Sequence, residues 1–178
     1  MNIPFLKQIL FGLLLLVITA APAISKGLNP RPIQWQDIWV ASQKMDVPFS
    51  VLILLLHLED GYVGLASPND NGTFDYGPFQ INSIHLKSPE FKAAGITSER
   101  LQYDGPTNAL AAAWYFKKVS LQANSMMDAV GRYHSRTPRF KAKYQLNFLK
   151  RTKSYKTVEM VIDRANRGMQ TLVAREGE

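Results

Sequence analysis

The chain has 178 residues, 46% hydrophobic and 20% charged, which is ordinary for a globular protein of one domain. It holds no cysteine, which argues against the small secreted folds that disulfides stabilise. Its net charge of +7 indicates either a polyanionic partner or a basic surface that is simply solvated. The sequence has no cluster of arginine and aromatic residues that would favour nucleic acid. Membrane surfaces and acidic cell-wall polymers therefore remain as candidate partners.

The first segment has the pattern of a signal peptide over residues 1–23. Lys7 precedes an apolar stretch from Ile9 to Ala20, and Ala21-Pro22-Ala23 fits the small-x-small site of signal peptidase. The stretch is shorter than the roughly 20 apolar residues of a membrane span. We expect cleavage after Ala23 and a periplasmic protein of net charge +6, because Lys7 is the one charged side chain lost; an uncleaved membrane anchor is the alternative.

Helix signals dominate the remainder of the chain. Apolar residues recur at helical spacing over 32–45, and residues 49–59 are apolar on all sides, which is typical of a buried central helix. We expect Asp46 to cap the start of this central helix and Gly61 to end it in a left-handed conformation. Later helices are expected over 107–120, 125–133 and 139–151, with short ones opening near 88–90 and 97–99.

A turn-rich stretch follows the central helix. Asn71-Gly72 is a strong hairpin signal, and short strands are expected near residues 63–65 and 79–81. The predicted fold class is therefore mainly α, an α+β arrangement in which a helical domain carries a small β-hairpin lobe. We place this domain at residues 24–151, followed by a charged, partly helical tail at residues 152–178.

The sequence does not support a metal site. His57 and Glu59 fall on different faces of a helix, and the paired cysteines of a zinc deaminase are absent. An EF-hand loop with Gly72 in sixth place would put Pro78 where a bidentate glutamate is needed. No phosphate loop, nucleophile elbow or Cys/His pair occurs either, so we expect neither a metal nor a cofactor.

Glu59 is the strongest candidate for a catalytic residue. It directly follows the apolar run 51–58, at the end of the expected central helix. Apolar surroundings and the negative end of the helix dipole both raise the pKa of a carboxyl group. A general acid in glycoside cleavage must be protonated when it meets the leaving oxygen. The alternative is a surface glutamate at a frayed helix end.

The motifs E-x-G, N-x-N-G-T-x-D-Y-G-P-F-Q-I-N-S and Y-H-S-R-T-P…K-Y occur in this order. Together they resemble the lysozyme-like lytic transglycosylases, in particular the small ones that accompany type III and IV secretion, conjugation and pilus machines. The resemblance covers about residues 33–150. The chain departs from the family pattern at Asp60, where serine is frequent, at Phe79, where methionine is usual, and at YHS, where YN is common.

The resemblance implies a role for individual residues. Glu59 matches the single catalytic acid and base of the family. Gly77-Pro78-Phe79-Gln80 matches its Gly-Leu-Met-Gln segment, so Gln80 would bind a saccharide and Phe79 would pack on a sugar ring. The hydroxyl of Tyr133 would approach the Glu59 carboxyl. The substrate-binding residues expected in this way are Gly77, Phe79, Gln80, Asn82 and Tyr133.

The implied function is cleavage of the β-1,4 bond between N-acetylmuramic acid and N-acetylglucosamine, with a 1,6-anhydro product. The implied partners are peptidoglycan strands and subunits of a secretion, conjugation or pilus machine, and the protein would be a monomer that binds no nucleic acid. A lysozyme-type hydrolase is a rival in which Asp70 or Asp75 would take part, whereas Asp60 should point elsewhere. A non-catalytic peptidoglycan-binding assembly factor and a cationic membrane-active protein using residues 139–151 are further rivals.

Overall fold

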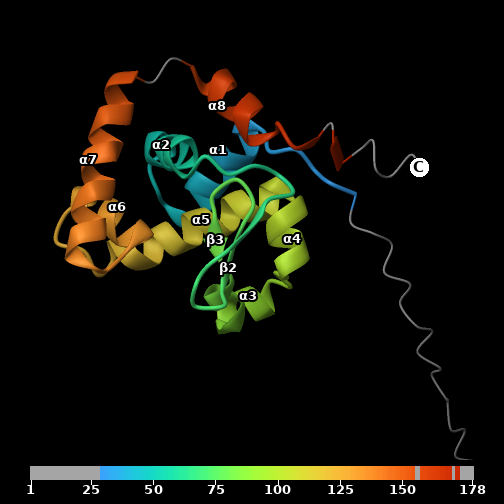
Figure 1. Cartoon of the computed structure of the whole chain (residues 1–178), viewed down its shortest axis with the longest axis horizontal. Helices are drawn as coiled ribbons and strands as arrows, with labels where there is room; N and C mark the ends of the chain where they lie inside the picture. Colours follow the sequence, from blue (N-terminus) through green and yellow to red (C-terminus); the bar gives the residue numbers. More distant parts are fainter. Residues whose placement is uncertain (1–28, 155–156, 170, 173–178) are drawn as a thin grey trace, which may run out of the picture.

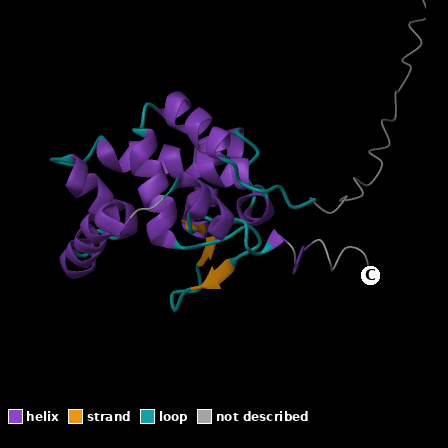
Figure 2. Cartoon of the chain, turned by 90° about the horizontal axis from the view of Figure 1, so that it is seen from above, coloured by secondary structure: helices purple, strands orange, loops and turns teal. Residues whose placement is uncertain are grey.

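The computed structural model describes residues 29–154, 157–169 and 171–172. The predicted fold class is confirmed: most of the described chain is helical, and one small antiparallel sheet forms a lobe at its edge (Figures 1 and 2). The helices are α1 (Trp35–Met45), α2 (Phe49–Glu59), the 3-10 helix η1 (Ser83–Lys87), α3 (Pro89–Ala93), α4 (Ser98–Tyr103), α5 (Gly105–Ser120), α6 (Met126–His134), α7 (Pro138–Ser154) and α8 (Val158–Ala165). The strands are β1 (Ala66–Pro68), β2 (Phe74–Tyr76) and β3 (Ile81–Asn82).

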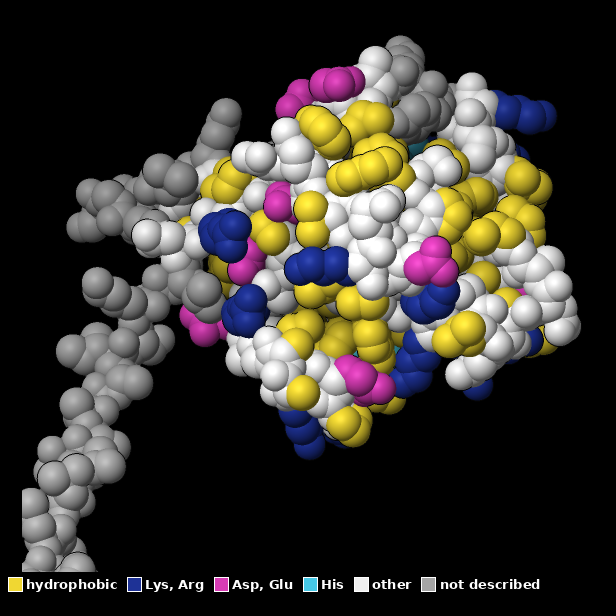
Figure 3. Space-filling view, turned by 180° about the vertical axis from the view of Figure 1, so that it is seen from behind, with side chains coloured by type: hydrophobic (Ala, Val, Ile, Leu, Met, Phe, Trp, Pro, Cys, Tyr) yellow, Lys and Arg dark blue, Asp and Glu magenta, His cyan; other side chains and the backbone are white. Residues whose placement is uncertain are grey.

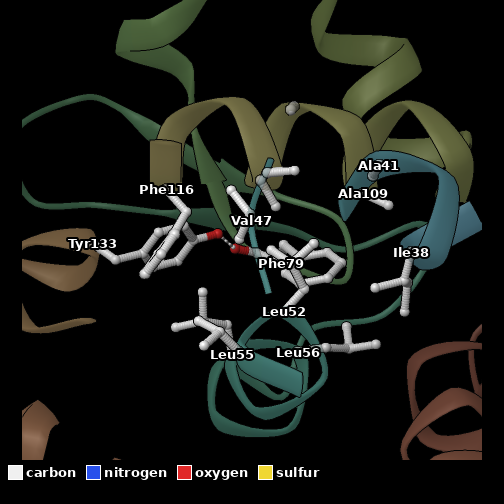
Figure 4. Packing of buried hydrophobic residues seen from close by; sticks show 14 of the residues in the cluster. Ile38, Ala41, Val47, Leu52, Leu55, Leu56, Phe79, Ala109, Phe116 and Tyr133 are labelled. Atoms are coloured by element: carbon white, nitrogen blue, oxygen red, sulfur yellow. Dashed lines mark hydrogen bonds between the residues drawn. The ribbon is translucent and has the colours of Figure 1, made fainter. Parts of the chain in front are cut away.

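The core forms around α2, as its apolar sequence predicts. This helix packs against α1, α7 and α8, and leucines on several of its faces are buried (Figure 4). Leu52 and Leu55 are fully enclosed, and Phe79 and Phe116 reach the same core from the β lobe and from α5. The end of α2 is thereby fixed against the rest of the molecule. Within the described part of the chain, no helix is long and apolar enough to span a membrane.

Both ends of α2 differ from the prediction. Asp46 has a left-handed backbone (φ 49°) and ends α1, while Pro48 is the residue that precedes α2. Asp60, with φ 53°, ends α2 in place of Gly61. Gly61 is needed for another reason, because a Cβ there would lie 2.2 Å from the Gly77 carbonyl oxygen. The glycine lets two backbone segments approach closely. In the sequence, a glycine needed for this reason looks the same as a glycine that ends a helix.

The sheet surrounds the predicted turn; β1 and β2 lie nearer to that turn than the expected strands, and β3 begins at Ile81, within the second expected strand. Strand β1 pairs with β2, and β2 with β3, all antiparallel, and the backbone N–H of Asn69 donates to the Thr73 carbonyl across the first connection. Residues 63–65 form no strand because their backbone groups bind elsewhere. Val63 N–H donates to the Ala165 carbonyl and Gly64 N–H to the Gln102 carbonyl. Helical segments distant in sequence thus take the hydrogen bonds that a strand would need.

The described part of the predicted tail belongs to the packed domain. Residue 152 lies inside α7, and Val161 and Ala165 of α8 are buried in the core. The Asn166 side chain accepts from the Ile33 backbone N–H and donates to the Ile33 carbonyl, which fastens the end of α8 to the beginning of the described chain. The predicted signal peptide, residues 1–23, lies outside the described residues.

Basic side chains on the face shown in Figure 3 are scattered among hydrophobic, neutral and acidic ones. Several cations of the molecule are paired with acids. Asp128 accepts from both Arg132 and Lys141 at 2.8 Å, and Asp46 accepts from Lys117 at 2.9 Å. Over the described residues visible in Figure 3, the basic side chains therefore form no continuous patch of the kind that backbone-directed nucleic-acid binding uses.

Candidate active site

A cleft of about 720 Å³ lies between the β lobe and α6, and Glu59 reaches it from the end of α2. We call this cavity the cleft. Its lining is mostly polar and comes from segments far apart in sequence: Glu59, Asn69, Asp70, Asn71, Thr73, Asp75, Gln80, Asn82, Ile84, His85, Tyr115, Arg132, Tyr133, His134, Ser135 and Arg136. The sequence-based prediction that Glu59 shares a site with the turn-rich stretch therefore agrees with the geometry.

The Glu59 carboxyl has the properties of a proton donor near neutral pH. Burial raises its pKa from 4.5 to about 7, and the negative charge of Asp75 adds to the increase. The hydrogen bond from Tyr144 acts in the opposite direction and lowers the pKa in part. Burial is the largest of these effects, as expected where the apolar helix α2 delivers the carboxyl to the site.

Tyr144 on α7 is the direct partner of Glu59. Its hydroxyl donates to Glu59 Oε1 at 2.5 Å, which is short for such a bond. The tyrosine is buried, and its ring stacks on His134 with centroids 4.6 Å apart. Burial and the nearby Glu59 charge raise the pKa of Tyr144 well above its usual range, so it remains a donor. The packing thus holds the carboxyl in one orientation.

The Tyr133 hydroxyl, predicted to approach Glu59, lies near enough to feel its charge but donates its proton elsewhere. That hydroxyl donates to the Phe79 backbone carbonyl at 3.2 Å (Figure 4). Tyr133 still lines the cleft, and burial, followed by the charge of Glu59, raises its pKa well above the ordinary value. Its ring packs against Tyr115 and Phe116. Tyr133 therefore joins α6 to the β lobe, while the helix that follows supplies the hydroxyl for Glu59.

Two further predicted binding residues have structural roles. Phe79 is fully buried in the core and does not line the cleft, so the expectation that its ring meets a sugar is wrong. Gly77 is also buried, with φ 68°, and a Cβ there would lie 2.3 Å from the Leu101 carbonyl oxygen. The Asn108 amide binds this segment, accepting from Phe79 N–H and donating to the Tyr76 carbonyl. The motif segment thus shapes the wall of the cleft from behind.

Gln80 and Asn82 lie in the cleft as predicted. Gln80 has a left-handed backbone (φ 48°), and its side chain accepts from the Ser67 hydroxyl and donates to the Gly77 carbonyl. Asn82 donates to Asp75 Oδ1 at 2.7 Å. Both amides are held in fixed orientations, which is the condition for selective hydrogen bonding to a ligand.

Asp75 is the second carboxylate of the cleft. It lies on β2 opposite Asn82, and its other oxygen accepts from Asn69 at 3.0 Å. Two amide donors therefore hold this side chain on the wall across from α2. The sequence did not decide whether Asp70 or Asp75 is the second carboxylate that a hydrolase would need beside Glu59. Both line the cleft, and the charge of Asp75 acts on the Glu59 pKa.

Asp60 points away from the cleft, as expected. Its side chain pairs with Arg164 and Arg167, each at 3.1 Å, and its carbonyl accepts from Arg167 at 2.6 Å. These contacts fasten the residue next to Glu59 to α8 and the turn that follows it. Among the residues that the structure describes, no group of three or more His, Cys, Asp or Glu side chains could hold a metal ion.

Comparison with known proteins yields two kinds of relative, and no family model matches the chain. Protein IpgF of Shigella sonnei is 29% identical over 114 residues, which are 63% of this chain and 74% of that protein. Invasion protein IagB of Salmonella typhimurium is 28% identical over 105 residues, which are 58% of this chain and 64% of that protein. The match thus spans less than two thirds of the IagB length.

The arrangement as a whole suits acid–base chemistry on a polar ligand. One wall supplies a carboxyl whose pKa is raised to about 7, and the other supplies the amides of Asn69 and Asn82 with the carboxyl group of Asp75. Sequence reasoning missed Tyr144, although its K-Y pair belongs to the last of the ordered motifs. The signal that could have indicated it was a tyrosine within the basic helix predicted over residues 139–151.

Proposed function

We propose that this protein cleaves the glycan strands of peptidoglycan as a lytic transglycosylase, with Glu59 as the catalytic acid and base. The observation that carries the proposal is the half-buried Glu59, whose pKa is raised to about 7 at the edge of a polar cleft. Such a carboxyl can give up a proton and take one back at neutral pH. The ordered motifs of the sequence support the same reaction class.

In the proposed reaction, protonated Glu59 donates to the glycosidic oxygen, and the bond from that oxygen to the muramoyl C1 breaks. The N-acetyl group of the substrate stabilises the positive charge at C1. Glu59, now a carboxylate, removes the proton of the C6 hydroxyl, and the C6 oxygen bonds to C1 to form the 1,6-anhydro ring. Tyr144 holds the carboxyl in place through both proton transfers, because its hydroxyl donates to Glu59 Oε1.

A lysozyme-type hydrolase is the second candidate, and the position of Asp75 favours it. The second carboxylate lies across the cleft and affects the Glu59 pKa. Retaining and inverting glycosidases use such a pair, in which one carboxyl protonates the leaving oxygen and the other acts as nucleophile or activates water. In this reaction a water molecule supplies the oxygen that bonds to C1, and no anhydro ring forms.

The relatives suggest the setting of the activity. IagB is named an invasion protein, and IpgF resembles this chain to a similar extent. We propose that the protein opens the cell wall locally for a secretion-type apparatus, acting in the periplasm after export. A basic protein would also be attracted to anionic peptidoglycan.

Mass analysis of the products tests the proposal. Purified sacculi are digested with the protein, and the soluble muropeptides are compared with those released by a muramidase. Products lighter by one water are expected for the transglycosylase, and products of equal mass would establish the hydrolase. If the folded wild-type protein released no muropeptide, both reactions would be contradicted. A non-catalytic assembly factor that binds peptidoglycan would then be the remaining hypothesis.

A further inference from the structure

A second cavity, of about 480 Å³, opens beside Glu59 on the side of α7. It is lined by Leu58, Glu59, His134, Phe140, Lys143, Tyr144 and Asn147, which belong to α2, α6 and α7 and not to the β lobe. We call it the α7 cavity. It shares Glu59 and His134 with the cleft, so the carboxyl lies where the two cavities meet. A ligand cleaved at Glu59 can therefore extend into both.

Two polar side chains of the α7 cavity, Lys143 and Asn147, make no hydrogen bond or ion pair with the residues that the structure describes. Lys143 is exposed. Lys141, two residues earlier on the same helix, instead binds Asp128 at 2.8 Å. The sequence of α7 contains no acidic residue, so the helix itself offers Lys143 no counter-ion. An unpaired ammonium and an unpaired amide thus line the cavity next to the reacting group.

Besides Glu59, His134 and Tyr144, the α7 cavity is lined by two apolar side chains, Leu58 and Phe140. Phe140 is 44% exposed, with the Arg139 guanidinium over its ring at 4.7 Å, and Leu58 is half-buried. Apolar surface with a few fixed polar groups is the usual composition of a small-ligand site. The two polar groups that make no hydrogen bond with the described residues are the Asn147 amide, which can bind sugar hydroxyl or acetamido groups, and the Lys143 ammonium, which favours an anionic substituent.

We propose that the α7 cavity binds the sugar unit on one side of the cleaved bond and that Lys143 recognises a carboxylate on that unit. The inference rests on the proposed glycan-cleaving function and makes it more specific. The carboxylate belongs either to the lactyl group of muramic acid or to a peptide attached to it. Lys143 is thus a specificity residue, which selects muramic acid strands over uncharged polymers of N-acetylglucosamine.

Calorimetric binding to a protein that carries Glu59→Gln tests the inference without turnover. Three probes are compared: a tetramer of N-acetylglucosamine, an alternating muramic acid fragment without peptides, and the same fragment with its peptides. Adding Lys143→Gln is expected to weaken binding of carboxylate-bearing fragments about two- to fivefold, the range of an exposed ion pair. The uncharged tetramer should bind equally well to both proteins, and the difference should shrink at high salt.

Matched variants separate recognition from general charge. Lys150 is exposed on the same helix and lines neither cavity, so Lys150→Gln should leave all three affinities unchanged. Lys143→Arg should retain the preference. An effect on both muramic acid fragments identifies the lactyl carboxylate, and an effect on the peptide-bearing one alone identifies the peptide.

Equal weakening for the uncharged tetramer, or no weakening for either muramic acid fragment, would overturn the inference while leaving the proposed function intact. If the folded Glu59→Gln protein with its native Lys143 binds none of the three probes, glycan binding itself is contradicted. Melting temperatures of all variants verify that they are folded.

Discussion

The carboxyl groups on the two walls of the cleft, Glu59 and Asp75, lie in different surroundings. On the helical wall, Glu59 comes at the end of an apolar helix, and burial raises its pKa to about 7. On the β-lobe wall, Asp75 accepts hydrogen bonds from the amides of Asn69 and Asn82, one on each oxygen. The helical wall therefore favours the protonated form of its acid. The β-lobe wall instead holds its acid between two amide donors.

The contrast shows how one cleft can combine two chemical roles. A carboxyl near apolar surface can donate a proton, and a carboxylate held by amides supplies negative charge near a developing cation. The surroundings of the two carboxyl groups are built from different kinds of structure. The helical wall combines Glu59 at the end of α2 with side chains of α5 and α6, while the β-lobe wall depends on strand register and turn geometry.

Replacing Glu59 by glutamine should have the largest effect. The amide has nearly the same shape but can neither donate nor recover a proton, so wall-lytic activity should fall about 10²- to 10⁴-fold or disappear. Zymography and the release of soluble muropeptides measure the loss, with circular dichroism as the control for folding. Wild-type activity in the folded variant would exclude Glu59 as the acid.

Tyr144→Phe and Tyr133→Phe form a matched pair that tests the helical wall. Loss of the hydrogen bond to Glu59 in Tyr144→Phe should cost about 1.5–3 kcal/mol, and the rate should fall about 10- to 100-fold if the bond acts in the transition state. Tyr133→Phe loses a bond to a backbone carbonyl, so its melting temperature should fall with a smaller change in rate. Muropeptide release and thermal unfolding are measured for both variants. If Tyr133→Phe slowed the reaction more than Tyr144→Phe, Tyr133 and not Tyr144 would be the residue that positions Glu59.

The pKa of Glu59 predicts a stability that depends on pH. Its pKa is about 7 in the folded protein against an ordinary value of 4.5, so between these values the folded state binds a proton that the unfolded state does not. The free energy of unfolding therefore falls as pH rises, by about 3 kcal/mol at most for this group. Urea unfolding should show Glu59→Gln more stable than wild type at about pH 8 and similar to it at about pH 4. Parallel curves for the two proteins would contradict the raised pKa.

Asp75→Asn tests the β-lobe wall and should have a smaller effect on a transglycosylase. Removing the negative charge lowers the pKa of Glu59, because Asp75 contributes to its increase. The decline in rate at high pH should then begin at a lower pH, with the optimum rate reduced by less than about tenfold. The pH profile of muropeptide release measures both quantities. A loss of about 10²-fold or more without a change in product mass would instead assign Asp75 a direct role in hydrolysis.

The sequence by itself determined the helical frame and the position of the acid. Period, apolar runs and turn residues are local signals, and they correctly predicted the central helix, the turn near Asn71-Gly72 and a glutamate at the end of α2. They also favoured a raised pKa for Glu59, because the apolar neighbours in sequence are on the same helix. The strand expected over residues 63–65 was wrong because helices distant in sequence bind its backbone groups.

Only the tertiary structure decided which side chains meet at Glu59. Tyr133 and Tyr144 lie on successive helices, and the packing of α6 on α7 turns one hydroxyl to a backbone carbonyl and the other to the carboxyl. Phe79 follows the same principle, since it is buried in a core that it shares with residues of α2 and α5. Such choices are made by long-range packing, in which residues far apart in sequence compete for the same space, and no local pattern records the outcome.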